Sequence, residues 1–197
     1  VVPLTIMIDN TVYIDGETIT RDDFMDEMAA AQNLPKTSQP AVGTFADVFD
    51  KLTADGSKVL AIHMTETISG TVNSSRQAAQ IAKGKVTVID SQFTDRAMAF
   101  QVLVAAEMAE AGKDMKTILD KLEQVRDNTT LVLGVTNLDN LVKGGRLSRV
   151  SGLISSFLNI KVILQLQNGE LKALRKGRGM KTINNFVTET ISKMAKL

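Results

Sequence analysis

The sequence of 197 residues predicts an α/β protein: a mostly parallel sheet with flanking helices, followed by a second, smaller α/β domain. Short apolar runs alternate along most of the chain with longer segments of helical periodicity, a pattern typical of parallel sheets. Charge supports the division, since residues 1–140 carry a net charge of −8 and residues 141–197 one of +9. We therefore expect an N-terminal domain at 1–128 and a second domain at 129–197.

The first part of the chain shows strand, turn and capping signals. The expected elements are strands at 3–8 and 12–14, a helix between Thr20 and Pro35, a polar loop at 37–40 and a helix at 43–52. Asp9-Asn10 is a turn pair between the two strands. Thr20 is a good N-cap, and Gly56 follows the second helix as a stop signal.

The middle of the chain supplies the alternation of strands and helices. Apolar runs predict strands at 58–64, 85–90 and 131–135, and periodic runs predict helices at 74–82, 97–111 and 115–126. Because the strands are apolar at almost every position, we expect them to be covered by helices on both faces of one sheet.

The last part predicts a hairpin and a terminal helix. The expected elements are a short helix at 138–141, a helical turn at 153–158, strands at 161–166 and 171–174, and a helix at 182–197. Asn168-Gly169 favours a type I′ turn between the strands.

Composition excludes several classes of site. With no cysteine and one histidine, the chain has no disulfide, no thiolate nucleophile, no Cys-based zinc site and no multi-histidine metal centre. No run approaches the roughly 20 apolar residues of a membrane span. No secretory leader is visible, so we expect a cytoplasmic location.

Three polar loops could hold an anion. Ser69, Gly70 and Thr71 precede a predicted helix, where hydroxyls and free N–H groups can bind a carboxylate or phosphate, or simply cap the helix. Thr37 and Ser38 offer hydroxyls before a proline, and spacing alone favours a turn there.

The third loop, residues 143–149, combines two glycines with basic side chains. Arg146 could grip an oxyanion with two N–H groups, or the loop could be a connector with surface arginines. The basic segment, residues 141–197, could likewise bind nucleic acid, an acidic protein or an anionic ligand, or its charges could simply be solvated. The segment shows no series of aromatic residues on which bases could stack, so nucleic-acid binding has only charge in its favour.

Catalytic chemistry has less support. Ser69 lies six residues from His63, but no G-x-S-x-G motif is present, and His63 in an apolar strand is typical of a hydrogen-bonded core histidine. A serine-dependent enzyme acting on an acyl or phosphorylated substrate, with Ser69 as nucleophile, stays an alternative, as does a regulatory binding module that uses the basic segment.

Four motifs occur together in one order: residues 37–40, 62–71, 88–91 and 144–148. As a set they resemble the DegV family over essentially the whole chain. The resemblance implies a two-domain α/β protein that binds one long-chain fatty acid. It also implies that the chain presents the acid to a separate ATP-dependent fatty-acid kinase subunit for phospholipid synthesis, without being an enzyme or needing a cofactor.

The resemblance also implies roles for single residues. Thr37 and Ser38, together with Ser69 and the Gly70 backbone, would hold the carboxylate, and Arg146 would organise the polar network around it. Arg149 and Arg178 would lie on the face that docks the kinase. The family's first strand has no counterpart before Val1, and part of its second domain has none after Leu197, which implies truncation at both ends.

Overall fold

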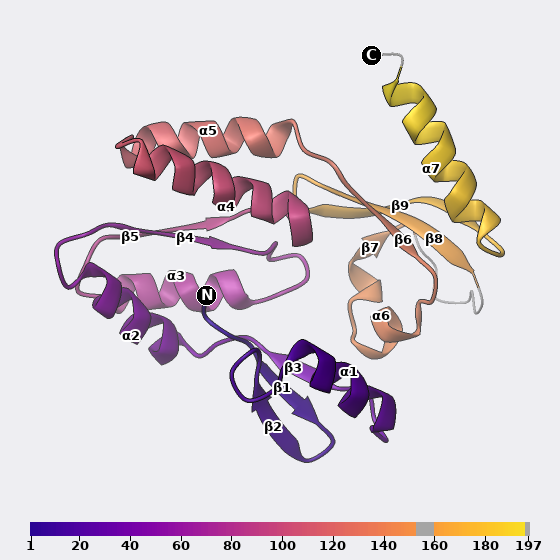
Figure 1. The fold of residues 1–197 in the computed structure, drawn as a ribbon, viewed down its shortest axis with the longest axis horizontal. Coiled ribbons are helices and arrows are strands. Elements are labelled where there is room, and N and C mark those ends of the chain that lie inside the picture. The colour runs from indigo at the N-terminus through magenta and orange to yellow at the C-terminus, as the bar shows by residue number, and fades with distance from the viewer. Residues whose placement is uncertain (153–159, 196–197) are drawn as a thin grey trace.

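The computed structural model describes residues 1–152 and 160–195, and it confirms the predicted α/β class (Figure 1). The described strands form three sheets, with the orders β2-β1-β3, β4-β5 and β6-β8-β9-β7. The predicted helical turn at 153–158 lies outside the described residues.

The first sheet is a small antiparallel one built from the opening of the chain. Its strands are β1 (Thr5–Ile8), β2 (Thr11–Ile14) and β3 (Lys36–Ser38). Helix α1 (Arg21–Ala30) begins as predicted, since the Thr20 hydroxyl accepts a hydrogen bond from the Asp23 N–H group.

The expectation of a loop at Thr37 and Ser38 is wrong, because both residues belong to β3. Thr37 lies opposite Ile6 and Ser38 opposite Thr5 in an antiparallel pair with β1. A three-residue strand carries no periodicity of its own, so this pairing depends on a partner about 30 residues earlier in the chain. Both side chains are exposed.

The predicted parallel arrangement is formed by β4 (Val59–His63) and β5 (Val86–Asp90). Helices α2 (Val42–Thr53) and α3 (Thr71–Ile81) lie on one side of this pair, and α4 (Asp95–Glu110) and α5 (Met115–Asp127) on the other (Figure 1). Side chains alternate accordingly: Ala61 packs with the cluster around Phe45, whereas Ile62 packs with the cluster around Leu122.

The third sheet lies in the range 129–197, where the sequence predicts the second domain. It contains β6 (Leu131–Val135), β7 (Val150–Ser151), β8 (Lys161–Gln167) and β9 (Glu170–Gly177). The predicted hairpin is present, with Asn168 and Gly169 both at positive φ, as a type I′ turn requires. Strand β6 pairs antiparallel with β8, so it does not join the parallel pair as its apolar composition suggested.

Within the described residues, two short helical segments and one long helix accompany the third sheet. The chain between β6 and β7 forms α6 (Asp139–Lys143) and the 3₁₀ turn η1 (Leu147–Arg149). Helix α7 (Lys181–Met194) lies across the outer side of the sheet (Figure 1). Arg175 anchors it, because its guanidinium lies 5.4 Å from the ring centre of Phe186 and bonds to the Glu189 carboxylate.

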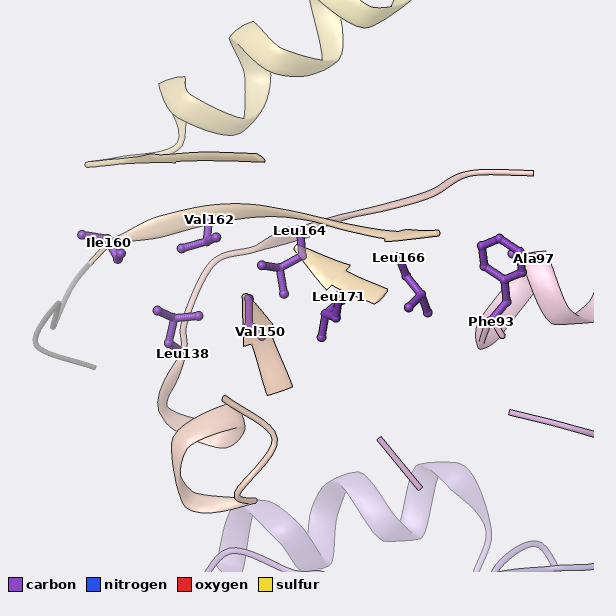
Figure 2. Packing of buried hydrophobic residues seen from close by; sticks show 9 residues of the cluster. All are labelled: Phe93, Ala97, Leu138, Val150, Ile160, Val162, Leu164, Leu166 and Leu171. Atoms are coloured by element: carbon purple, nitrogen blue, oxygen red, sulfur yellow. The ribbon is translucent and has the colours of Figure 1, made fainter. Parts of the chain in front are cut away.

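One side chain from the range predicted as the first domain packs into the core of the third sheet. Phe93, in the loop between β5 and α4, is fully buried in a cluster that includes Leu164, Leu166 and Leu171. Figure 2 shows it at the Leu166 end of that cluster. The loop after β5 and the third sheet therefore share one hydrophobic core at this point.

Candidate functional site

The polar loop after β4 has a defined hydroxyl pair. Ser69 Oγ and Thr71 Oγ1 lie 2.9 Å apart, and Ser69 Oγ also accepts a 3.3 Å hydrogen bond from the Thr71 N–H group. Gly70 is the N-cap residue of α3. Ser69 thus binds the first N–H group of α3 without being its N-cap residue, and the hydroxyl pair stands at the positive end of an 11-residue helix.

Gln39 joins the Thr37–Ser38 segment to this loop. Its Nε2 donates a 2.6 Å hydrogen bond to Ser74 Oγ on α3. A Cβ atom added to Gly70 would clash with Gln39 Oε1, so a larger residue at this position would displace the Gln39 side chain. Sequence reasoning missed Gln39, although it stands inside the motif at 37–40.

Thr37 and Ser38 precede Gln39 on the exposed edge of β3. Their side chains hydrogen-bond to no other group within the described ranges, 1–152 and 160–195. The structure therefore brings the first two predicted loops together while it leaves these two hydroxyls facing solvent.

Arg146 brings the third loop to the same place. Its Nε donates to the carbonyl oxygen of Ile68 at 3.2 Å, and its Nη1 donates to the carbonyl oxygen of Gly144 at 2.7 Å. Gly145 has φ +72°, a conformation that favours glycine, and so allows the chain to turn at this point. Arg146 is exposed and thus accessible to a ligand.

Arg149 and Arg178 are exposed but stand apart. Arg149 precedes β7, whose first residue pairs with Leu171 near the start of β9, and Arg178 follows the end of β9. A strand rises about 3.3 Å per residue, so about 20 Å of β9 separates them. Both arginines lie in the C-terminal part of the sequence, but they do not form one compact cluster.

His63 ends β4 beside these loops. Its ring lies edge-on to Phe45, with 5.3 Å between ring centres, and its Nε2 is buried without a hydrogen-bond partner in the described part of the chain. The expectation of a hydrogen-bonded core histidine is therefore wrong. Burial lowers the pKa of His63, and the neighbouring Asp90 opposes that effect.

An apolar groove of about 710 Å³ runs along β4 from this polar end. Side chains of α2, including Phe45 and Phe49, form one wall, and side chains of α4, including Val102 and Ala105, form the other. His63 and Thr71 lie among its lining residues, so the groove reaches one member of the hydroxyl pair, whereas Ser69 is not among the lining residues. Three of the nine methionines line it: Met64, Met98 and Met115.

Comparison with known proteins identifies the fold and its relatives. The profile of the DegV family matches residues 1–196. The chain belongs to the DegV family. A DegV domain-containing protein of Streptococcus pneumoniae is 49% identical over 195 residues, which are 99% of this chain and 70% of that protein.

Solved DegV structures share the arrangement described above. DegV of Bacillus subtilis, described as a fatty acid binding protein, has a TM-score of 0.86 at 28% identity, over 98% of this chain and 70% of that one. A fatty-acid-binding DegV family protein of Thermus thermophilus has a TM-score of 0.80 at 31% identity, over 95% and 69%.

Among the described residues, no three His, Cys, Asp or Glu side chains gather in a way that could hold a metal ion. Nor does any described helix combine the length and apolar character needed to span a membrane. The polar chemistry of the site consists of hydroxyls, main-chain groups, Gln39, His63 and Arg146.

Proposed function

We propose that this DegV chain binds a single long-chain fatty acid and presents its carboxylate to a separate, ATP-dependent fatty-acid kinase subunit. One observation carries the proposal: Thr71, at the N-terminus of α3, lines an apolar groove, and its hydroxyl forms a pair with the Ser69 hydroxyl. Such a site matches a ligand with a long apolar tail and one anionic end. The DegV structures described as fatty-acid-binding proteins support the same ligand class.

The groove would take the acyl tail. Its walls are mostly aliphatic and aromatic side chains from α2, β4 and α4. Burying a methylene group contributes about 0.8 kcal/mol, so a long tail supplies most of the binding free energy. Methionine adapts its shape easily, and the three lining methionines would accommodate different tails.

The three polar segments would take the carboxylate. Ser69 and the Gly70 backbone stand at the start of α3, where the helix dipole favours an anion. Arg146 uses only part of its guanidinium on main-chain oxygens, and the remaining N–H groups suit a carboxylate. Thr37 and Ser38 would complete the set, since their hydroxyls are exposed beside Gln39.

The tail site is tested by filling the groove. Ala106 on α4 lines the groove and is exposed, so Ala106→Phe narrows the groove without entering the core. Ala99→Phe on the same helix is the matched control, because Ala99 is exposed and is not among the lining residues. We expect palmitate affinity to fall at least tenfold in the first variant only. Equal palmitate affinity in the two variants would mean that the acyl tail binds outside this groove.

The carboxylate site is tested by removing hydroxyls. A hydrogen bond to a charged group contributes about 1.5–3 kcal/mol, so Ser69→Ala and Thr37→Val should each weaken palmitate binding about tenfold or more. Thr44→Val, an exposed position on α2, is the control. Unchanged affinity in a variant would remove that residue from the site.

The proposed contacts with the kinase subunit are the basic side chains of Arg149 and Arg178. Because about 20 Å of β9 separates Arg149 from Arg178, each needs its own charge reversal. We expect Arg149→Glu and Arg178→Glu to lower acyl phosphate formation with a purified kinase subunit while palmitate affinity stays unchanged. A normal rate for either variant would exclude that arginine from docking. Such a partnership would place the chain in the cytoplasm.

A further inference from the structure

The carboxylate of Asp90 ties together the two loops that follow the parallel strands. Asp90 ends β5 and lies opposite His63, the last residue of β4. Its Oδ2 accepts a 3.1 Å hydrogen bond from the Glu66 N–H group, and its Oδ1 accepts a 2.7 Å bond from the Gln92 N–H group. One side chain therefore fixes the start of both loops.

A main-chain bond strengthens this connection. The Thr65 N–H group donates to the carbonyl oxygen of Phe93 at 2.8 Å. Ser91 supports Phe93 from within the same loop, because its hydroxyl both donates to the Phe93 carbonyl and accepts from the Phe93 N–H group. Residues 65–71 and 91–95 thus form one hydrogen-bonded unit.

Both loops also contact the second domain. Phe93 is fully buried among that domain's core side chains (Figure 2). The Thr67 hydroxyl donates to the carbonyl oxygen of Gly169, in the turn between β8 and β9. The loop that carries Ser69 is consequently held by Asp90 on one side and by the second domain on the other.

We propose that Asp90 is a positioning residue for the fatty-acid carboxylate, a role that rests on the proposed function. Asp90 acts through the Glu66 amide, which sets where the Ser69–Thr71 hydroxyl pair stands relative to Arg146 on the second domain. Binding of the carboxylate to that pair then stiffens loop 91–95 and the turn at Gly169 as well as its own loop. Asp90 itself needs no contact with the ligand.

The variant Asp90→Asn tests this role. The Glu66 and Gln92 N–H groups bind different oxygens of the carboxylate, and asparagine replaces one of these oxygens with an NH2 group that donates, so one of the two N–H groups loses its acceptor. We expect the palmitate dissociation constant to rise about tenfold. Asp9→Asn is the matched control, because the Asp9 carboxylate likewise accepts 3.1 Å bonds from two main-chain N–H groups, those of Gln32 and Asn33, and Asp9 is not among the groove-lining residues. It should lower stability and leave the dissociation constant unchanged.

Amide hydrogen exchange separates positioning from simple stabilisation. In the wild-type chain, palmitate should slow exchange in 65–71, in 91–95 and at 168–169. In Asp90→Asn at saturating palmitate, slowing should be confined to 65–71. A dissociation constant within twofold of wild type, or slowing that still reaches 91–95, would overturn the proposal.

The same experiment distinguishes failure of the wider function. If the wild-type chain binds no palmitate, the proposed function fails and the positioning role fails with it. The link that Asp90 forms between the two loops is still tested without ligand, since the Glu66 and Gln92 amides should exchange faster in Asp90→Asn than in the wild type. Unchanged exchange at both amides would show that Asp90 does not hold the loops.

Discussion

Arg146 donates through Nε to the main-chain carbonyl oxygen of Ile68, 3.2 Å away and 78 residues earlier in the chain. This bond joins the second domain to the loop that carries Ser69. A second bond, from Nη1 to the Gly144 carbonyl oxygen at 2.7 Å, holds the guanidinium plane in place. The arginine is therefore oriented before any ligand arrives, which lowers the entropy lost on binding.

Replacing Arg146 should lower palmitate affinity while changing the free energy of unfolding little. Arg146→Gln keeps some hydrogen-bonding capacity but removes the charge, so we expect palmitate affinity to fall about tenfold or more by titration calorimetry. Arg149→Gln, three residues away and also exposed, should bind palmitate as the wild type does. Equal losses in both variants would mean that general positive charge, rather than Arg146, attracts the ligand.

Phe93 should contribute strongly to stability. Removing a fully buried phenylalanine side chain typically costs about 3 kcal/mol or more, and Phe93 has no exposed surface. We expect Phe93→Ala to lower the urea midpoint clearly, whereas Phe100→Ala, at a position that is 53% exposed, should shift it little. Similar shifts for both would contradict a shared core at Phe93.

Gly70 should be coupled energetically to Gln39. Gly70→Ala places a Cβ atom against Gln39 Oε1, so the Gln39 side chain must move and its bond to Ser74 breaks. That bond is worth about 1 kcal/mol. In a Gln39→Ala background, Gly70→Ala should therefore cost less free energy of unfolding than in the wild type. Strictly additive costs in this double-mutant cycle would exclude the contact.

His63 should make stability depend on pH just below neutrality. Burial lowers its pKa in the folded chain, with Arg76 adding to the shift and Asp90 opposing it, so the unfolded chain binds a proton more readily. Stability is then fully present above the unfolded value of 6.5 and falls as the pH drops through the folded pKa.

The measurement is urea unfolding between pH 5.5 and 7.5. His63 is the only histidine, and no other side chain of this chain ordinarily titrates there. His63→Leu should flatten the dependence of the free energy of unfolding on pH in this range. A slope that persists in the variant would assign the effect to another group.

Local signals predicted much of the fold. Thr20 caps α1, and Asn168-Gly169 forms the hairpin turn, because both depend on a few neighbouring residues. The sheet that β6 joins could not be predicted in the same way. Five apolar residues suit either a parallel or an antiparallel partner, and pairing with β8 depends on residues about 30 positions away.

The sequence motifs indicated which loops could form the site, but they did not indicate the contacts between those loops. Ser69 and Gly70 precede α3, as the polar loop before a predicted helix suggested. The contact of Arg146 with the same loop did not follow from its residue type, because it joins positions 78 residues apart. Gln39 and Phe93 gave no sequence signal for their roles, because each acts through a contact made only after folding. Thr37 and Ser38 were expected in a loop and lie in β3.

The most direct test of the central claim compares palmitate with its methyl ester in one calorimetric titration of the delipidated chain. The ester keeps the tail and lacks the charged carboxylate. We expect saturable binding of one palmitate per chain and at least tenfold weaker binding of the ester, because charge-assisted hydrogen bonds are lost. No saturable binding of palmitate, or equal affinity for acid and ester, would contradict it.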